Sequence, residues 1–341
     1  MNRRTSTIPR ATEPEVAILQ YRLLQYRVPL FERLRAACES RGLRLRLVHG
    51  QPSAAEAVRR DTATLPWADV VHNRFWHIGG KDLLWQPFPA ALRRARLVVM
   101  MQESRILSNY PWLFAPGSPR VAFWGHGRNF QSTAPDGLRE RWKAGLRNRV
   151  DWWFAYTDLS ARIVADGGYP GDRITVLDNA IDNEGFATDL ATARAEQVAA
   201  LRQRIGAEPG APVGLYCGSL YPDKRLDLLV QAARMVQRAR PDFRLVVLGD
   251  GPSRPLIEDA ARTLPWLHWA GVQRGIDKAA WFRAADCYLS PGAVGLHVLD
   301  AFCAGLPMIT TDSALHGPEI AYLASGRNGF IVPADAADYA A

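Results

Sequence analysis

The 341-residue sequence predicts an α/β protein built from two Rossmann-like, doubly wound parallel-sheet domains that face a cleft. Short apolar strand-like runs alternate with helix-like periodic stretches along the whole chain, and the length suits about two domains of roughly 150 residues. A polar, glycine-bearing stretch from Asn179 to Phe186 separates two such series. We therefore expect an N-terminal domain at residues 1–183 and a C-terminal domain at residues 184–341.

The first series opens with the apolar run Val16–Leu19, which is typical of a buried strand. The segment Pro29–Ser40 carries apolar residues at helical spacing and is followed by Gly42, which predicts a helix that ends there. Further strands are predicted at Leu43–Leu47, Leu97–Met101, Val121–Trp124, Trp152–Tyr156 and Ile174–Leu177.

The second series begins with a strand at Val213–Cys217, after a helix predicted near Ala191–Ile205. Strands are then predicted at Phe243–Leu248, Leu267–Ala270, Cys287–Leu289 and Met308–Thr311. The helices expected between them are Leu226–Arg238, Arg254–Thr263, Asp277–Ala284 and Gly295–Ala304. Strictly alternating elements of this kind favour parallel sheets, whose ligands bind at the carboxyl ends of the strands.

Composition excludes several classes of protein. The content of 48% hydrophobic and 22% charged residues is that of a globular protein and excludes a disordered chain. The densest apolar run, Leu97–Met101, is far shorter than the ~18 residues that would span a bilayer. The first residues have no apolar segment behind them, and the four widely spaced cysteines suit reduced thiols, so we expect a cytoplasmic protein without a secretory signal.

Charge is unevenly distributed along the chain. Residues 1–150 hold 25 Lys and Arg against 11 Asp and Glu, a net charge of +14, whereas residues 151–341 hold 17 against 23, a net charge of −6. The basic half suits an anionic partner such as an acidic membrane surface or a phosphate-bearing lipid. A solvated arginine-rich surface explains the charge equally well. No zinc finger or RNA-binding signature is present, so we expect no nucleic-acid partner.

Two loops of the second series carry candidate binding residues. The run Gly218–Lys224 follows the first strand directly, and a lysine at this position can reach a phosphate. The alternative is an ordinary surface lysine beside a helix cap at Asp223. In the run Pro291–Asp300, Gly292 and Gly295 allow close backbone approach, and a helix that opens near Gly295 presents amides to an anion.

Asp300 lies about one and a half turns into that helix, where a carboxylate suits ribose hydroxyls beyond a phosphate. The alternative is a plain glycine-rich turn with a solvated aspartate. The sequence contains neither G-x-G-x-x-G nor G-x-x-x-x-G-K-[ST], which disfavours a nicotinamide dinucleotide or a P-loop nucleotide.

The order of these motifs is similar to that of a known family. Six short motifs follow one another along the chain in this order: Gly218–Lys224, Leu248–Pro252, Trp269–Val272, Gly295–Pro307, Pro318–Ile320 and Asn328–Gly329. With the less specific Trp124–Gly127 and Asn179–Asp182 of the first half, this order resembles the family-4 glycosyltransferases, which have the GT-B fold.

The resemblance implies a nucleotide-sugar donor in the second domain and an acceptor in the first. It implies retaining transfer with catalytic roles for His126, Lys224 and Asp300, without a metal ion and without any cofactor besides the donor as co-substrate. The implied donor-binding residues are Gly218, Ser219, Lys224, Arg225, Gly271, Val272, Gly292, Val294, Gly295, Leu296 and Asp300. The chain also lacks any D-x-D sequence that would suit a metal-bound diphosphate.

The sequence departs from the family pattern at three places. The first acid of the family's acidic pair falls on Gly292, and the arginine expected after the first glycine falls on Ser219, where Arg225 is the substitute we consider. The glycine pair of the first loop is absent between Leu23 and Pro29, and the sequence ends at Ala341, before the helices that follow in the family.

Two functions therefore stand as hypotheses. The first is a retaining glycosyltransferase of cell-surface polysaccharide biosynthesis, which acts on a glycan or lipid-linked acceptor in the cytoplasm or, in peripheral contact with anionic lipid, at the inner membrane face. The second is a non-catalytic nucleotide-sugar-binding relative that acts as a partner or sensor, an alternative that Gly292 motivates.

Overall fold

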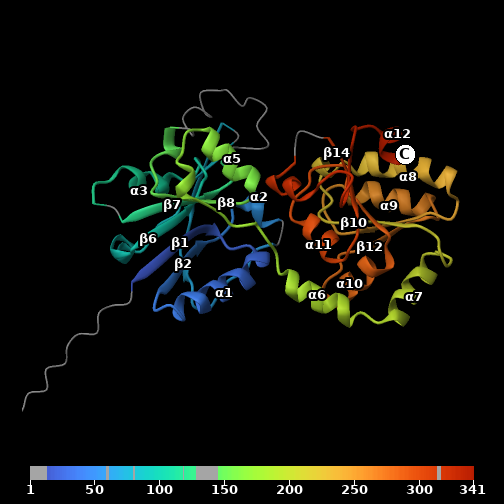
Figure 1. The fold of residues 1–341 in the computed structure, drawn as a ribbon, viewed down its shortest axis with the longest axis horizontal. Helices are drawn as coiled ribbons and strands as arrows, with labels where there is room; N and C mark the ends of the chain where they lie inside the picture. Colours follow the sequence, from blue (N-terminus) through green and yellow to red (C-terminus); the bar gives the residue numbers. More distant parts are fainter. Residues whose placement is uncertain (1–13, 59–60, 80, 118, 128–144, 313–315) are drawn as a thin grey trace, which may run out of the picture. The chain divides into compact units, whose positions relative to one another are not determined.

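The computed structural model describes residues 14–58, 61–79, 81–117, 119–127, 145–312 and 316–341 (Figure 1). The chain forms two compact units: unit 1 comprises the described residues of 1–127, 136–156 and 160–177, and unit 2 those of 157–159 and 178–341. The change from one unit to the other near Asp178 lies a few residues before the boundary that the sequence predicts at Asn183.

Unit 1 contains a seven-stranded sheet with the strand order β3-β2-β1-β6-β7-β8-β9, and every neighbouring pair in it is parallel. The strands are β1 (Glu15–Arg22), β2 (Arg44–Gly50), β3 (Asp69–Val70), β6 (Leu97–Met101), β7 (Arg120–Gly125), β8 (Trp152–Ala155) and β9 (Ile174–Val176). The strands predicted for the first series are confirmed. Among the strands of this sheet, β3 alone was not expected, because two residues are too few to show a pattern.

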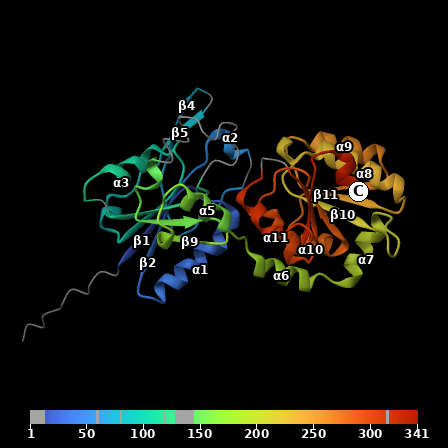
Figure 2. The same ribbon diagram turned by 45° about the horizontal axis from the view of Figure 1, so that its top comes forward.

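Helices and one hairpin complete unit 1. The α-helices are α1 (Val28–Glu39), α2 (Ala54–Ala57), α3 (Tyr110–Phe114) and α5 (Asp158–Asp166), and the 3-10 turns are η1 (Gln25–Arg27), η2 (Ala90–Arg94), η3 (Leu107–Asn109) and η4 (Gly171–Arg173). Strands β4 (Arg74–Ile78) and β5 (Lys81–Trp85) pair antiparallel in a separate two-stranded sheet. Figure 2 shows this hairpin standing out from the rest of unit 1.

Unit 2 contains a six-stranded parallel sheet with the order β12-β11-β10-β13-β14-β15. The strands are β10 (Val213–Cys217), β11 (Arg244–Leu248), β12 (Leu267–Gly271), β13 (Cys287–Leu289), β14 (Met308–Thr311) and β15 (Gly329–Val332). The helices are α6 (Asn183–Thr192), α7 (Ala195–Arg204), α8 (Leu226–Ala239), α9 (Arg254–Thr263), α10 (Gly275–Ala284), α11 (His297–Cys303) and α12 (Ala336–Ala340), with 3-10 turns η5 (Pro222–Lys224) and η6 (Pro318–Tyr322). This is the strand order of a doubly wound dinucleotide-binding sheet. From β10 the chain adds strands first on one side, as β11 and β12, and then on the other side, as β13, β14 and β15.

Helices cover both faces of the unit 2 sheet, as alternating side chains require. Leu215 and Val246 belong to the apolar cluster that includes residues of α6, α10 and α11, whereas Leu245 and Val247 belong to the cluster that includes α8 and α9. Side chains of successive strand residues point to opposite faces, so each strand contributes to both clusters. The predicted doubly wound fold class is thus confirmed in both units.

The segment between the two sheets differs from the prediction. One helix was expected near residues 191–205, but the chain forms α6 and α7, separated where Ala193 adopts an extended conformation. The polar stretch predicted as a linker is helical from Asn183 onward, because the Asp182 carboxylate accepts a hydrogen bond from the Gly185 N–H and caps α6. No helix in the described part of the chain combines the length and apolar character needed to cross a membrane.

Candidate active site

The loops after β10 and β13 meet in unit 2 at the point where the order of the strands reverses. The connections of these two neighbouring strands lead in opposite directions, which leaves a crevice at their carboxyl ends. The loop after β10 carries Lys224, and the loop after β13 carries the run Ser290–Leu296. The two motifs that the sequence analysis singled out therefore come together at one edge of the sheet.

Lys224 connects the two loops by a hydrogen bond. Its Nζ donates a 2.6 Å hydrogen bond to the Ala293 carbonyl oxygen, and the side chain is only 14% exposed. Burial lowers the pKa of Lys224, while Asp223 and Glu319 favour its charged form. The reading as an ordinary surface lysine is thus wrong. Asp223 is not a helix cap either, because α8 begins at Leu226 after Arg225, which adopts the left-handed conformation (φ 51°).

The close contact between the two loops explains why residue 292 is a glycine and not the acid of the family pattern. The Ala293 N–H donates a 2.9 Å hydrogen bond to the Asp223 carbonyl, so the two loops are in backbone contact. A Cβ on residue 292 would lie 2.5 Å from the Lys224 Cα and closer still to the Asp223 carbonyl oxygen. The position of a family acid is therefore occupied here by the backbone that carries Lys224.

The backbone amides after Gly292 differ in whether they donate a hydrogen bond within the protein. The Val294 N–H donates to His316 Nδ1 at 3.1 Å, while His316 Nε2 lies 2.7 Å from the Thr311 carbonyl. This pattern suits a neutral imidazole with its proton on Nε2, and burial lowers its pKa accordingly. Among the described residues, the N–H groups of Gly295 and Leu296 donate no hydrogen bond. These two amides can therefore bind an anion, whereas that of Val294 cannot.

Asp300 is a buried acid, not the solvated aspartate of the alternative reading. It projects from α11 and is 8% exposed, and its Oδ2 lies 2.8 Å from Lys278 Nζ of α10. Burial raises the pKa of Asp300, and Lys278 opposes this shift. The second carboxylate oxygen, Oδ1, is buried and accepts no hydrogen bond from any described residue. A buried acceptor without a donor is costly and suits a ligand hydroxyl.

His297 is a component that the sequence analysis did not assign. Its ring stacks on Tyr288 with centroids 5.7 Å apart, and its Nε2 lies 3.2 Å from the Ser290 hydroxyl. Burial lowers the pKa of His297 to about 3, with further contributions from Lys224, His316 and Lys278. The neighbourhood therefore combines two neutral imidazoles with two lysines, of which Lys278 lies 2.8 Å from Asp300 and Lys224 lies 3.7 Å from Asp223. No motif marked His297, because only folding places it between these cations.

The other predicted donor residues occupy the surrounding loops. The Gly218 N–H bonds the Leu248 carbonyl at 3.0 Å, and Ser219 is exposed. Arg225, considered as a substitute for the family arginine, lies 3.6 Å from Asp227. Val272 is exposed after Gly271, at the end of edge strand β12. A pocket of about 460 Å³ along this edge is lined by Arg204, Ile205, His268, Trp269, Ala270, Gly271, Gln273 and Trp281.

His126 lies in unit 1, directly after β7. Its imidazole stacks on the Tyr156 ring with centroids 4.1 Å apart. Burial, together with the charge of Arg27, lowers the pKa of His126 to about 4, so the ring is neutral at pH 7. The geometry makes His126 a neutral hydrogen-bonding group at the carboxyl edge of the unit 1 sheet.

Arg27 is a second component that sequence reasoning missed. It is 3% exposed and donates hydrogen bonds to Gln20, Tyr26 and Tyr156, and its guanidinium lies over the Trp124 ring. No carboxylate in the described part of the chain pairs with it within 4.0 Å. A buried cation held by neutral groups and aromatic faces makes this edge electropositive.

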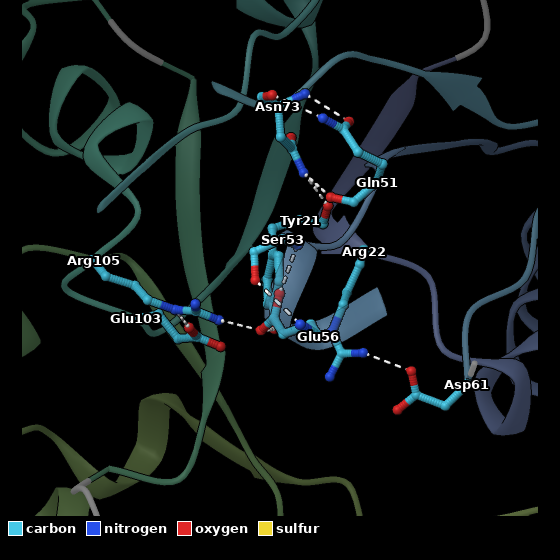
Figure 3. Close-up of polar contacts among 9 residues, drawn as sticks. All are labelled: Tyr21, Arg22, Gln51, Ser53, Glu56, Asp61, Asn73, Glu103 and Arg105. Atoms are coloured by element: carbon cyan, nitrogen blue, oxygen red, sulfur yellow. Dashed lines mark hydrogen bonds and ion pairs between the residues drawn. The ribbon is translucent and has the colours of Figure 1, made fainter. Parts of the chain in front are cut away.

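A polar network occupies the corresponding reversal point of unit 1, between β1 and β6 (Figure 3). The Tyr21 hydroxyl donates to Glu56 at 2.8 Å, and Arg105 pairs with the same carboxylate at 3.1 Å. Arg22 bonds the Tyr21 hydroxyl and pairs with Asp61, and Arg105 also pairs with Glu103 at 2.6 Å. Two arginines thus pair with three carboxylates, and these ion pairs and hydrogen bonds connect the loops of this edge.

Comparison with known proteins finds a family model that matches most of unit 2. Residues 211–341 match the family model described as "Glycosyl transferases group 1". The chain is 24% identical over 178 residues to the alpha-monoglucosyldiacylglycerol synthase of Acholeplasma laidlawii, covering 50% of this chain and 42% of that protein. It is 28% identical over 280 residues to the D-inositol 3-phosphate glycosyltransferase of Nocardia farcinica, covering 76% and 55%. The chain therefore spans about half the length of the curated relatives it matches.

Solved structures extend the likeness to both units. Anabaena Alr3699/HepE, solved in complex with UDP, aligns with a TM-score of 0.65 at 15% identity and covers 96% of this chain and 88% of that one. WaaG, a glycosyltransferase involved in lipopolysaccharide biosynthesis, aligns with a TM-score of 0.54 at 14% identity, covering 93% and 86%. At such identities the likeness shows the fold alone. The chain has the GT-B fold, and its residues 211–341 match the model of the group 1 glycosyl transferases.

Proposed function

We propose that this chain is a retaining, metal-independent glycosyltransferase of cell-surface polysaccharide biosynthesis that takes its sugar from a nucleotide diphosphate donor. The observation that carries the proposal is the contact between Lys224 and the Ala293 carbonyl at the reversal point of the unit 2 sheet. It holds a largely buried cation against the loop that carries the amides of Gly295 and Leu296, a combination that suits a diphosphate.

The donor would lie across the loops of unit 2. Lys224 and the two amides would hold the diphosphate, and the neutral imidazole of His297 would add a hydrogen bond. The buried Oδ1 of Asp300 would accept a ribose hydroxyl, while its Oδ2 remains paired with Lys278. Gly271 and Val272 would border the base. His126 of unit 1 is assigned to the donor sugar by the family resemblance.

The chemistry follows from what these groups can do. The bond between the anomeric carbon and the diphosphate breaks as the acceptor oxygen forms its bond on the same face of the sugar. The acceptor proton passes to an oxygen of the leaving phosphate. The protein supplies no nucleophile: Lys224 and the amides stabilise the charge that grows on the phosphate.

The names of the relatives support the proposed substrates. Anabaena Alr3699/HepE has been solved with UDP-glucose, and the Acholeplasma protein is named as a synthase of a glycolipid. We infer a nucleotide-sugar donor and a glycan or lipid-linked acceptor for this chain. We also infer action at an anionic membrane surface, which the net charge of +14 on residues 1–150 (25 basic against 11 acidic residues) favours.

Donor binding tests the proposal directly. Nucleotide diphosphate sugars are screened by thermal shift, since a ligand of the native state raises the melting temperature, and the best is titrated by calorimetry. Lys224→Ala should weaken its binding by about tenfold to a hundredfold, the effect of losing one charge-assisted hydrogen bond. Arg240→Ala is the matched control, because Arg240 is exposed and pairs with the exposed Asp242.

Equal affinity of Lys224→Ala and the wild type would refute the assignment of the diphosphate site. A protein that binds the donor but neither transfers nor hydrolyses the sugar across a broad acceptor panel would refute the catalytic function. It would leave the binding relative as the explanation.

A further inference from the structure

The β4–β5 hairpin exposes an apolar face on unit 1. Its register pairs Trp76 with Leu83 and Arg74 with Trp85, which places these side chains and Ile78 on one face because strand residues alternate. Trp76 is 46% exposed and Ile78 is 62% exposed, while Leu83 and Trp85 are partly buried. Large apolar side chains gathered on one exposed face mark an interaction surface.

The opposite face of the hairpin is fixed to the body of unit 1. Phe75 and Leu84 pack with Tyr21 and Ile106, and the Leu84 N–H donates a 2.9 Å hydrogen bond to the Arg105 carbonyl. The apolar outer face is thus presented by an anchored element, at the carboxyl edge of the unit 1 sheet where β1 ends.

The root of the hairpin is fixed as well. The buried Asn73 side chain donates to the Tyr21 carbonyl at 2.6 Å and to the Gln51 carbonyl at 2.8 Å (Figure 3). A Cβ on Gly50 would collide with this side chain, so the close fit requires glycine there. Such an arrangement keeps the hairpin in one orientation.

The chemistry of the outer face indicates a lipid partner. Tryptophan suits the boundary between headgroups and acyl chains, where its ring is buried and its N–H remains hydrated. Arg74 is exposed on the same face and suits a lipid phosphate. The net charge of residues 1–150 is +14, from 25 basic and 11 acidic residues, which attracts an anionic surface and repels a second copy of the same basic unit.

We propose that the outer face of the β4–β5 hairpin, formed by Arg74, Trp76, Ile78, Leu83 and Trp85, docks unit 1 on an anionic lipid bilayer. The proposal rests on the proposed function in one respect, since a lipid-linked acceptor would be presented at that surface. The hairpin would bring the carboxyl edge of the unit 1 sheet to the headgroups.

Vesicle sedimentation tests the proposal without requiring any transfer reaction. The full chain is mixed with vesicles of phosphatidylglycerol and phosphatidylcholine, or of phosphatidylcholine alone. The wild type should bind the anionic vesicles, and added salt should weaken binding. Trp76→Ser with Ile78→Ser should reduce the partition coefficient at least tenfold, roughly the effect of withdrawing one large apolar side chain from the bilayer. Arg74→Gln should reduce it about fivefold.

Phe330→Ser is the control, because Phe330 is 53% exposed and belongs to unit 2. It should bind vesicles like the wild type, and all variants should keep the wild-type melting temperature and donor affinity. Equal vesicle binding by the double variant would overturn the proposal. A concentration-dependent dimer in sedimentation velocity that the double variant abolishes would also overturn it, by showing that a second copy covers the face. Loss of vesicle binding with donor affinity intact separates this proposal from the proposed function.

Discussion

Adding a single methyl group at Gly292 tests how the two loops of unit 2 form the candidate site. In Gly292→Ala, the new Cβ would lie 2.5 Å from the Lys224 Cα and still closer to the Asp223 carbonyl oxygen, so the backbone of one loop must move. Overpacking of this kind costs about 1–3 kcal/mol. Displacement also endangers the hydrogen bond from the Ala293 N–H to Asp223, worth about 1 kcal/mol. We expect the free energy of unfolding to be roughly 2–4 kcal/mol lower than in the wild type.

The same displacement separates Lys224 Nζ from the loop after β13, so donor affinity should fall about tenfold or more. Urea unfolding gives the change in stability, and calorimetry with the donor gives the change in affinity. Gly171→Ala is the matched control, because a Cβ on Gly171 meets nothing within 4 Å and should leave both quantities unchanged. If Gly292→Ala unfolds and binds donor like the wild type, the close contact between the loops is not what positions Lys224.

Three further predictions follow from buried charges and imidazoles. Asp300→Asn leaves Lys278 without its carboxylate and should lower the free energy of unfolding by about 3 kcal/mol. Adding Lys278→Met should restore most of the lost stability. If the two losses are additive in urea unfolding, the pairing is contradicted. The pKa of His297 is lowered to about 3 in the folded protein, while the unfolded imidazole takes up a proton near pH 6.5. Stability should therefore be full above pH 6.5 and decline as the pH falls toward 3, and His297→Asn should flatten this decline in melting temperatures measured at pH 7, 5.5 and 4.5. Arg27→Met removes a charge that helps to lower the pKa of His126 to about 4, so an NMR titration should find that pKa raised but still below 6.5, because burial is the larger cause; an unchanged value would show that Arg27 does not act on His126.

Regular elements were predictable because their patterns are local. The apolar runs at Leu97–Met101, Val213–Cys217 and Met308–Thr311 became strands with those bounds, and Arg254–Thr263 became a helix with those bounds. The β4–β5 hairpin was not predicted, because its two strands are apolar on both faces and show no clean alternation. The split between α6 and α7 was also missed, since it depends on the extended conformation of two residues, Ala193 and Arg194.

The residues of the candidate site likewise include some that the sequence could identify and some that it could not. Lys224, Gly292 and Asp300 were identifiable because they stand in ordered motifs of glycines and charges. The ion pair between Glu103 and Arg105 was not identifiable, because the loop after β6 brings the two side chains together before η3 begins and no motif marks that loop.

From sequence alone came the parallel α/β class, the places of most strands, the asymmetry of charge and the set of motifs that resembles a glycosyltransferase family. These properties depend on residue types at short spacing, and short spacing fixes backbone periodicity and local charge. Only the tertiary structure decided that the backbone of Lys224 occupies the space beside Gly292. It also decided that, within the described part of the chain, Asp300 Oδ1 has no donor and the buried Arg27 has no carboxylate partner. These properties depend on contacts between segments that are far apart in the chain. Such segments approach one another and lose their solvent only when the sheet is assembled.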